Sequence, residues 1–183
     1  DENIAIGLNA LQNPTSGSFN IAMGSGALRN GSATDGNFRY NIAFGWSAVN
    51  GLKSGQKNVA IGNGSMRNAG QNGTNIDDSI GIGYETLRAL EKGDGNIAIG
   101  EQAMENTETG SYNIAIGSYA LDQSNNGMSS GGNDYNIAIG QHTGGSLKNG
   151  ARNTLIGHGA MSGGGGDGKS ITDNTFIGYF SAQ

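Results

Sequence analysis

The hydrophobic pattern of this chain is a five-residue unit that recurs almost unchanged from one end to the other. It is typified by Asn113-Ile114-Ala115-Ile116-Gly117. Successive units start 17, 21, 17, 21, 17, 17, 23, 17 and 21 residues apart. A short fixed period of this kind indicates a stacked repeat architecture. The ten units begin at Asn3, Asn20, Asn41, Asn58, Ser79, Asn96, Asn113, Asn136, Asn153 and Asn174.

Within each unit, counted from the Asn as position one, bulky and small residues alternate. The second and fourth positions are apolar in eight of the ten copies, the third is mostly alanine, and the fifth is always glycine. Alternation of β-branched residues with period two predicts a short strand that has one bulky and one small face. Glycine then ends the strand. The small face lets either another wall of the same coil or another chain approach closely.

A second apolar element follows each predicted strand. Its eighth position is small and its ninth is mostly large, as in Ala120 and Leu121. The pattern fits either a second strand or one helical turn, and Leu87 and Leu90 favour a helical turn between Tyr84 and Lys92. All five 17-residue repeats carry glycine at position fifteen, which suggests a fixed turn that side chains disfavour. The longer repeats insert loops at one offset, so these loops should emerge on one side: 31–39, 70–77, 125–134 and 163–173.

Stacked coils would place each strand about 4.8 Å from the next, paired in parallel. The isoleucines would then form a continuous apolar stripe, and the Asn side chains would hydrogen-bond to one another along the stack. The predicted fold class is therefore all-β, a parallel β-solenoid (β-roll) of about ten coils of 17–23 residues. Residues 1–183 form a single repeat array, which we expect to be a fragment of a longer fibre.

Composition changes this picture by limiting the core. The chain has 35 glycines, no cysteine, 34% hydrophobic and 14% charged residues. So little apolar material predicts that coils stack on one another, that chains self-associate, or both. The net charge of −5 argues against nucleic acid and anionic membranes as partners. No apolar run approaches the ~20 residues of a membrane span, so no membrane insertion is expected of this sequence.

The unit N-[IV]-A-I-G-x-x-A-[LM], as at Asn96 to Met104 and Asn113 to Leu121, resembles known repeats. It is similar to the head repeats of trimeric autotransporter adhesins, the YadA-like left-handed β-roll. It looks still more like the repeats of phage tail fibres, because the 17-residue period is longer than that of adhesin heads and the units are rich in Asn. The resemblance covers nearly the whole chain. It implies a homotrimer of parallel solenoids whose small faces meet near the threefold axis, and a surface-exposed attachment role.

Two motifs suggest a binding site, one for phosphate and one for calcium, but lack the surrounding sequence that such a site requires. Residues 163–170 match the phosphate-binding pattern G-x-x-x-x-G-K-[ST], but they lead directly into the next strand and leave no room for the required helix. We interpret them as a loop. Aspartates beside glycines suggest calcium, yet the repeated calcium-binding nonapeptide is missing, so we interpret them as solvated loop carboxylates and leave calcium binding open. They are Asp35, Asp77, Asp78, Asp134 and Asp167.

His142 and His158 fall just beyond the strand glycines of adjacent coils, where the two side chains could lie close together. Without a second ligand type we predict no metal site, no cofactor and no catalytic residue. A group of glutamates on consecutive coils is interpreted as a solvated face, and no pair stands out as a glycosidase pair. These glutamates are Glu85, Glu91, Glu101, Glu105 and Glu108.

Aromatic and imidazole side chains at the variable sixth and seventh positions are the candidate receptor contacts. Such rings either bind sugars and protein surfaces or cover the coil edges and the seams of a trimer. Phe19, Tyr40, Tyr112 and Tyr135, which precede the repeat Asn, are open to the same two interpretations. The candidate contact residues are Trp46, Tyr84, Tyr119, His142, His158 and Tyr179.

The leading hypothesis is a non-enzymatic, extracellular fibre segment that attaches to a host or cell surface. It would belong to the receptor-binding region of a phage tail fibre on the virion surface, with a host glycan or outer-membrane receptor as partner. Alternatives are the head of a bacterial trimeric adhesin on a cell surface, a polysaccharide-degrading tailspike and a passive spacer. Ice binding would need regular Thr ladders, but only Thr154 and Thr175 stand at equivalent positions.

Overall fold

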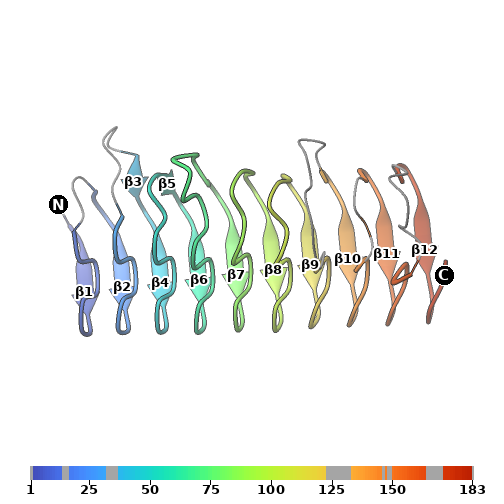
Figure 1. Ribbon diagram of the computed structural model, residues 1–183, viewed down its shortest axis with the longest axis horizontal. Helices are drawn as coiled ribbons and strands as arrows, with labels where there is room; N and C mark the ends of the chain where they lie inside the picture. Colours follow the sequence, from blue (N-terminus) through green and yellow to red (C-terminus); the bar gives the residue numbers. More distant parts are fainter. Residues whose placement is uncertain are drawn as a thin grey trace.

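The computed structural model describes residues 2–13, 17–31, 37–122, 133–145, 147, 150–163 and 171–182. Within these residues the chain winds into a straight stack of coils, one for each repeat, with the strands side by side across the long axis (Figure 1). The described part of the chain contains strands and turns and no helix. The predicted all-β parallel solenoid is confirmed.

In the described residues the central strand of every unit joins one ten-stranded parallel sheet, in which each residue pairs with its equivalent in the next coil. A second sheet pairs only β3 (Phe38–Arg39) with β5 (Gly55–Gln56). The strands of the main sheet are β1 (Ile4–Ile6), β2 (Ile21–Met23), β4 (Ile42–Phe44), β6 (Val59–Ile61), β7 (Ile80–Ile82), β8 (Ile97–Ile99), β9 (Ile114–Ile116), β10 (Ile137–Ile139), β11 (Thr154–Ile156) and β12 (Thr175–Ile177).

The small face of the sheet points into the coil. Ala115 is fully buried, whereas its neighbour Ile116 leaves 37% of its surface exposed. The interior is narrow because the ninth-position side chains of the opposite wall, such as Leu121, already fill it. The small faces therefore pack inside a single chain, and the expectation that they meet at a threefold axis between chains is wrong.

The second wall is neither a regular strand nor a helical turn. Glu85 and Leu87 both have a positive φ, of 50° and 51°, which excludes the helical turn expected between Tyr84 and Lys92. The wall is instead a series of tight turns that hydrogen-bond from coil to coil. The backbone N–H of Leu87, for example, donates to the carbonyl of Ala103 at 3.1 Å. A turn with a side chain in the left-handed region persists here because each copy is held by the copies beside it.

Departures from the repeat in the core are compensated by neighbouring residues. Gly144 stands where most coils have a ninth-position Leu or Met, and a Cβ on it would lie 2.8 Å from Leu121 and 2.9 Å from Leu155. Leu155 occupies a third position that is alanine in most other coils, so its larger side chain fills the space that Gly144 leaves. The summed volume is kept, as close packing requires.

Buried Asn side chains form the predicted ladder. Asn113 Oδ1 accepts the backbone N–H of Asn136 at 2.9 Å and its Nδ2–H at 3.1 Å. The Nδ2 of Asn113 donates to Asn96 Oδ1 at 3.1 Å and to the carbonyl of Asn133 at 2.5 Å. That carbonyl lies three residues before the next unit. An Asn inside the stack, such as Asn113, thus ties its own strand to the coils on both sides and to the end of its own coil.

The fifth-position glycine is required for two reasons. Gly117 has φ +131°, which side chains rarely adopt, and a Cβ there would lie 2.6 Å from the carbonyl of Gly140 in the next coil. The glycine expected at position fifteen, in a turn that side chains disfavour, is found in such a conformation at Gly110, where φ is +143°. Close stacking of identical backbones leaves no room for a side chain at these turns.

The loop from Gly70 to Asp77 lies at the same edge of the rod as β3 and β5 (Figure 1), which confirms the predicted side for this insertion. Residues 32–36, 123–132 and 164–170, which make up most of the other insertions, lie outside the described residues, as does most of the phosphate-loop-like segment. No helix in the described residues is long and apolar enough to cross a membrane.

Candidate functional site

One face of the rod carries a strip of mostly apolar side chains, which we call the apolar strip: the second and fourth positions of the main-sheet strands. Most fourth-position side chains are exposed, and most second-position side chains, which include Thr154, are half-buried. The fourth-position residues Ile61, Ile82, Ile116, Ile139 and Ile156 each leave 36–38% of their surface exposed. Soluble monomers rarely show continuous apolar patches larger than a few hundred Å². A strip that follows ten consecutive strands is therefore a candidate interface.

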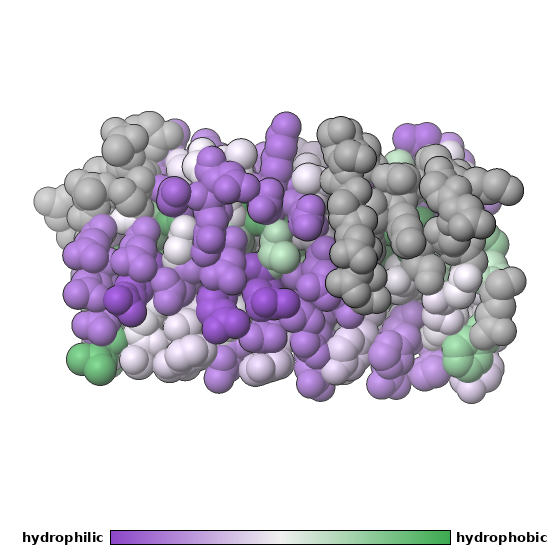
Figure 2. Space-filling view, viewed as in Figure 1, coloured by the Kyte–Doolittle hydropathy of each residue, from purple (hydrophilic) through white to green (hydrophobic). Residues whose placement is uncertain are grey.

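A different face is polar. In Figure 2 the coloured part of the surface is mostly hydrophilic. Paired charges contribute to the polar surface of the rod: Arg67 contacts Glu85 at 3.0 Å, and Arg88 contacts Glu105 at 2.6 Å. Glu105 is only 6% exposed, so the expectation that it belongs to a solvated face is wrong. Burial raises the pKa of Glu105, and the neighbouring guanidinium of Arg88 opposes that shift.

The loop aspartates also have structural roles. Asp77 Oδ1 accepts the backbone N–H of Gln56 at 2.8 Å, and Asp134 Oδ1 accepts that of Ser111 at 2.8 Å. Asp78 pairs with the ammonium group of Lys57. Asp77 and Asp134 tie coils together, which corrects their interpretation as solvated loop residues. The side chain of Asp78 is 57% exposed, as expected of a solvated carboxylate. Asp35 and Asp167 lie outside the described residues.

Residues that precede the repeat Asn form stacked pairs along the rod. Phe19 stacks on Tyr40 with ring centroids 5.0 Å apart, and Tyr112 stacks on Tyr135 at 5.2 Å. All four have φ between 58° and 61°, which turns their rings outward beside the strand. Their stacking favours the interpretation that they cover the edges of successive coils.

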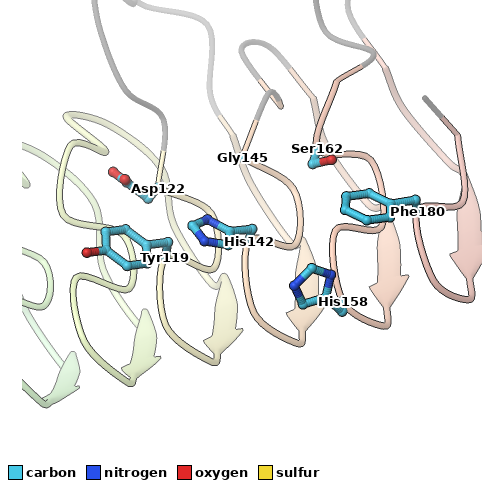
Figure 3. A pocket seen from close by; sticks show the side chains of 7 residues that line it. All are labelled: Tyr119, Asp122, His142, Gly145, His158, Ser162 and Phe180. Atoms are coloured by element: carbon cyan, nitrogen blue, oxygen red, sulfur yellow. The ribbon is translucent and has the colours of Figure 1, made fainter.

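The turns at the C-terminal end of the rod enclose a pocket of about 480 Å³. Ligand sites typically measure ~300–1,000 Å³. Its side chains come from four consecutive coils, and Figure 3 shows those of Tyr119, Asp122 and His142 toward one end and those of Ser162 and Phe180 toward the other. They are drawn mainly from the seventh and tenth positions of the repeat. The lining residues are Tyr119, Asp122, His142, Gly145, His158, Ser162 and Phe180.

The pocket exists because two rows of side chains each lack one member. In the seventh-position row, Tyr119 and His142 stack at 4.9 Å, but the next coil has Gly159 and the row resumes only at Phe180. In the tenth-position row, Gly145 separates Asp122 from Ser162. His142 therefore has a parallel ring on one face only. His158 meets it edge-on, with centroids 6.3 Å apart.

Asp122 is the carboxylate of the pocket. Its Oδ1 accepts a hydrogen bond from Asn106 Nδ2 at 2.9 Å. Burial raises the pKa of Asp122, while the bond from Asn106 and the nearby His142 oppose the shift. A partly desolvated carboxylate is a strong acceptor for hydroxyl groups. Nδ1 of His158 is buried and has no hydrogen-bond partner among the described residues.

Four of the six candidate contact residues lie together. Tyr119 stacks on His142, and His158 stacks on Tyr179 at 5.3 Å. The expectation that the two histidines lie close together is confirmed, because their ring centroids are 6.3 Å apart. Among the described residues no cluster of three or more metal-ligating side chains occurs. Sequence reasoning missed Asp122, Gly145 and Ser162, although aligning the repeats by position would have placed them in one row.

The other two candidates lie apart from the pocket, on coils nearer the N-terminus. Trp46 is 51% exposed, and the guanidinium carbon of Arg67 lies 5.8 Å from its ring centroid. Tyr84 is 47% exposed on the coil that begins at Ser79. Neither residue lines the pocket.

Comparison of the chain with protein-family models, with curated proteins and with solved structures finds no match.

Proposed function

We propose that this chain is a non-enzymatic segment of an extracellular attachment fibre and that it assembles as a parallel homotrimer. The apolar strip carries the proposal, because a lone chain would leave it in water along the length of the rod. The small faces are already used inside each coil, so the strip is the surface on which chains meet. The resemblance implies that chains meet through their small faces, whereas we propose that they meet through the apolar strip. The threefold assembly that the resemblance implies stays part of the proposal.

Mass measurement with two matched variants tests the assembly. We expect light scattering to give three times the 18.6 kDa of the chain. Ile116→Lys with Ile139→Lys should give monomers, because buried lysines in an apolar seam lack partners. Asn72→Lys adds a charge to an exposed loop residue away from the strip and should remain trimeric. A wild-type monomer at all concentrations, or a trimer unaffected by the double variant, would overturn the proposal.

The attachment role is supported by the elongated shape together with the resemblance to fibre repeats. Coils longer than those of adhesin heads favour a phage tail fibre on the virion surface over a bacterial adhesin on a cell surface. A fibre of stacked coils holds its turns at fixed spacing, so side chains there can meet a host glycan or an outer-membrane receptor. Adsorption assays test this role: the purified chain should compete with whole particles for host cells.

The polysaccharide-degrading alternative is less well supported. Glycoside hydrolysis ordinarily needs two carboxyl groups that flank the bond to be cut. Asp122 is the one carboxylate among the described residues that line the pocket. A screen of capsular and lipopolysaccharide glycans should release no reducing ends, and sustained release would favour the tailspike instead. A passive spacer would show neither cleavage nor competition for host cells.

A further inference from the structure

We propose that Tyr112 and Tyr135 form a site of oxidative cross-linking, at which the two rings of one chain join into dityrosine. The rings lie on adjacent coils, just before β9 and β10, and stack with centroids 5.2 Å apart and planes 13° from parallel. Their residues are 54% and 57% exposed, so an oxidant can reach both. The site is separate from the pocket and independent of the proposed attachment function.

The backbone holds the two rings in this position. Both residues have a positive φ, of 58° and 59°, so their Cα–Cβ bonds point the same way from neighbouring coils. The N–H of Tyr112 donates to the carbonyl of Asp94 at 2.8 Å, which fixes its place in the stack. The N–H of Tyr135 donates in the same way to the carbonyl of Ser111 at 3.0 Å. The spacing of parallel strands, about 4.8 Å, then brings the rings into contact.

This arrangement selects one pair of tyrosines. Within the described residues, Tyr112 and Tyr135 are the one pair of the chain's six tyrosines whose rings stack on each other. On its other side Tyr112 leans over Gly95, where a Cβ would lie 2.6 Å from its Cδ1. Backbone therefore covers that side, and the ring that Tyr112 can join is that of Tyr135. Rings stacked on other tyrosines belong to residues that cannot form dityrosine: Phe19 beside Tyr40, His142 beside Tyr119 and His158 beside Tyr179.

The reaction needs a one-electron oxidant, such as a haem peroxidase with hydrogen peroxide. Each phenol gives up one electron and one proton, which leaves two phenoxyl radicals side by side. A carbon–carbon bond then forms between one Cε of each ring, and the hydrogen on each of these carbons passes as a proton to the phenol oxygen. The two electrons and two protons that are lost reduce hydrogen peroxide to water. Because the two radicals are held in contact, coupling within the chain is favoured over coupling between chains.

The position of the bond gives it a mechanical role. Tyr112 and Tyr135 are 23 residues apart, which is the longest spacing between equivalent positions of successive coils. A covalent bond across this segment removes conformational freedom from the unfolded chain, as a disulfide does. The chain has no cysteine, so no disulfide can do the same and no thiol competes for the oxidant.

Peroxidase treatment of the whole chain tests the proposal. We expect dityrosine fluorescence in a band that migrates as a single chain on a denaturing gel, and an intact mass lower by two hydrogen atoms. Mass spectrometry of a protease digest should find the peptide that contains Tyr112 joined to the peptide that contains Tyr135. The treated chain should melt at a higher temperature than the untreated chain.

Three variants locate the bond, and each keeps an aromatic ring at the substituted position. Tyr135→Phe retains a ring to stack on Tyr112 but removes the second phenol, so it should lose the single-chain fluorescence. Tyr84→Phe is the matched control, because Tyr84 is similarly exposed, at 47%, but lies on a different coil. Its fluorescence should equal that of the wild type. Phe19→Tyr should raise the fluorescence per chain, because Phe19 stacks on Tyr40 with centroids 5.0 Å apart.

The opposite results overturn the proposal. They are fluorescence confined to covalent dimers or larger species, single-chain fluorescence that persists in Tyr135→Phe, and a digest in which other tyrosines are joined. Absence of dityrosine, while free tyrosine in the same mixture is oxidised, would also refute it. An unchanged melting temperature after cross-linking would remove the mechanical role.

Discussion

Asn113 and Asn136, 23 residues apart in sequence, share one acceptor: Oδ1 of Asn113 takes both the backbone N–H and the side-chain N–H of Asn136. Both residues are almost fully buried. A buried N–H that loses its partner cannot hydrogen-bond to water instead, which costs free energy. Coils therefore stack favourably only where the Asn side chains of neighbouring coils are aligned. The row of buried amides sets the register of the whole rod.

Replacing Asn113 with Ala should destabilise the chain by about 2–4 kcal/mol, since a buried backbone N–H of Asn136 and the carbonyl of Asn133 each lose a partner. Denaturant unfolding monitored by circular dichroism measures the change. Asn72→Ala, in an exposed loop, is the control and should change stability by less than about 0.5 kcal/mol. Equal effects from both variants would refute the role of the ladder.

The ladder has one weak member, which predicts a stabilising substitution. Ser79 replaces Asn at position one, and its Oγ accepts the backbone N–H of Asn96 at a long 3.3 Å. Asn at this position should reach Asn58 Oδ1 and the carbonyl of Gly93, by analogy with the other coils. We expect Ser79→Asn to raise the free energy of unfolding by about 1 kcal/mol, the usual net value of a hydrogen bond. A loss of stability in the same unfolding assay would contradict this.

Gly117→Ala should prevent normal stacking, because the added Cβ meets the backbone of Gly140 and φ is unfavourable. We expect a loss of several kcal/mol or failure to accumulate as folded protein. Gly163→Ala is the matched control. A Cβ at Gly163 meets no atom within 4 Å, so the variant should fold with wild-type stability. Thermal melting of both variants decides the matter, and an ordinary melting curve for Gly117→Ala would disprove close contact between successive coils.

Stability should depend on pH through Asp122. Burial raises its pKa in the folded chain above the ordinary value near 3.9, so the folded state holds the proton more tightly than the unfolded state does. The ionised carboxylate therefore destabilises the fold at neutral pH, and this cost disappears as pH falls through the raised pKa. Asp122→Asn has no such dependence.

The comparison that isolates this effect is the difference in unfolding free energy between Asp122→Asn and the wild type. We expect the variant to be the more stable at pH 7 and its advantage to shrink only as the pH falls through the raised pKa of Asp122, as protonation neutralises the wild-type carboxyl. Removing the charge of Asp122 also lessens the rise in the pKa of Glu105, which changes this difference in the same direction. An advantage that grows toward acid pH would mean that the carboxylate is stabilised in the fold.

The sequence was sufficient to predict the strand, the parallel stacking and the Asn ladder, because Ile114, Asn113 and Gly117 recur at fixed positions. It did not reveal which face of the strand lies inside. The alternation of bulky and small residues is the same whether the bulky or the small face of the strand lies inside the coil. Bulky apolar side chains are commonly buried, so the pattern alone gives no reason to place the small face inside. Here Leu121 and its equivalents fill the interior from the opposite wall, so only residues the size of Ala115 fit between them.

The pocket could be predicted only in part. His142, His158 and Tyr119 stood out as rings at variable positions. The hollow itself depends on Gly159 and Gly145, whose significance emerges only when neighbouring coils are compared row by row. Asp122 resembled an ordinary surface acid in sequence, and its partial burial comes from the turns of the coils beside it.

The absent side chain at Gly159 also bears on how such a rod can change. A single substitution to glycine in an outward-facing row opens a cavity between two coils while the amide ladder and the inner wall stay as they were. The outer surface and the stacking scaffold are thus altered by different positions of the same repeat. The surface of such a rod can change shape coil by coil without loss of the ability to fold.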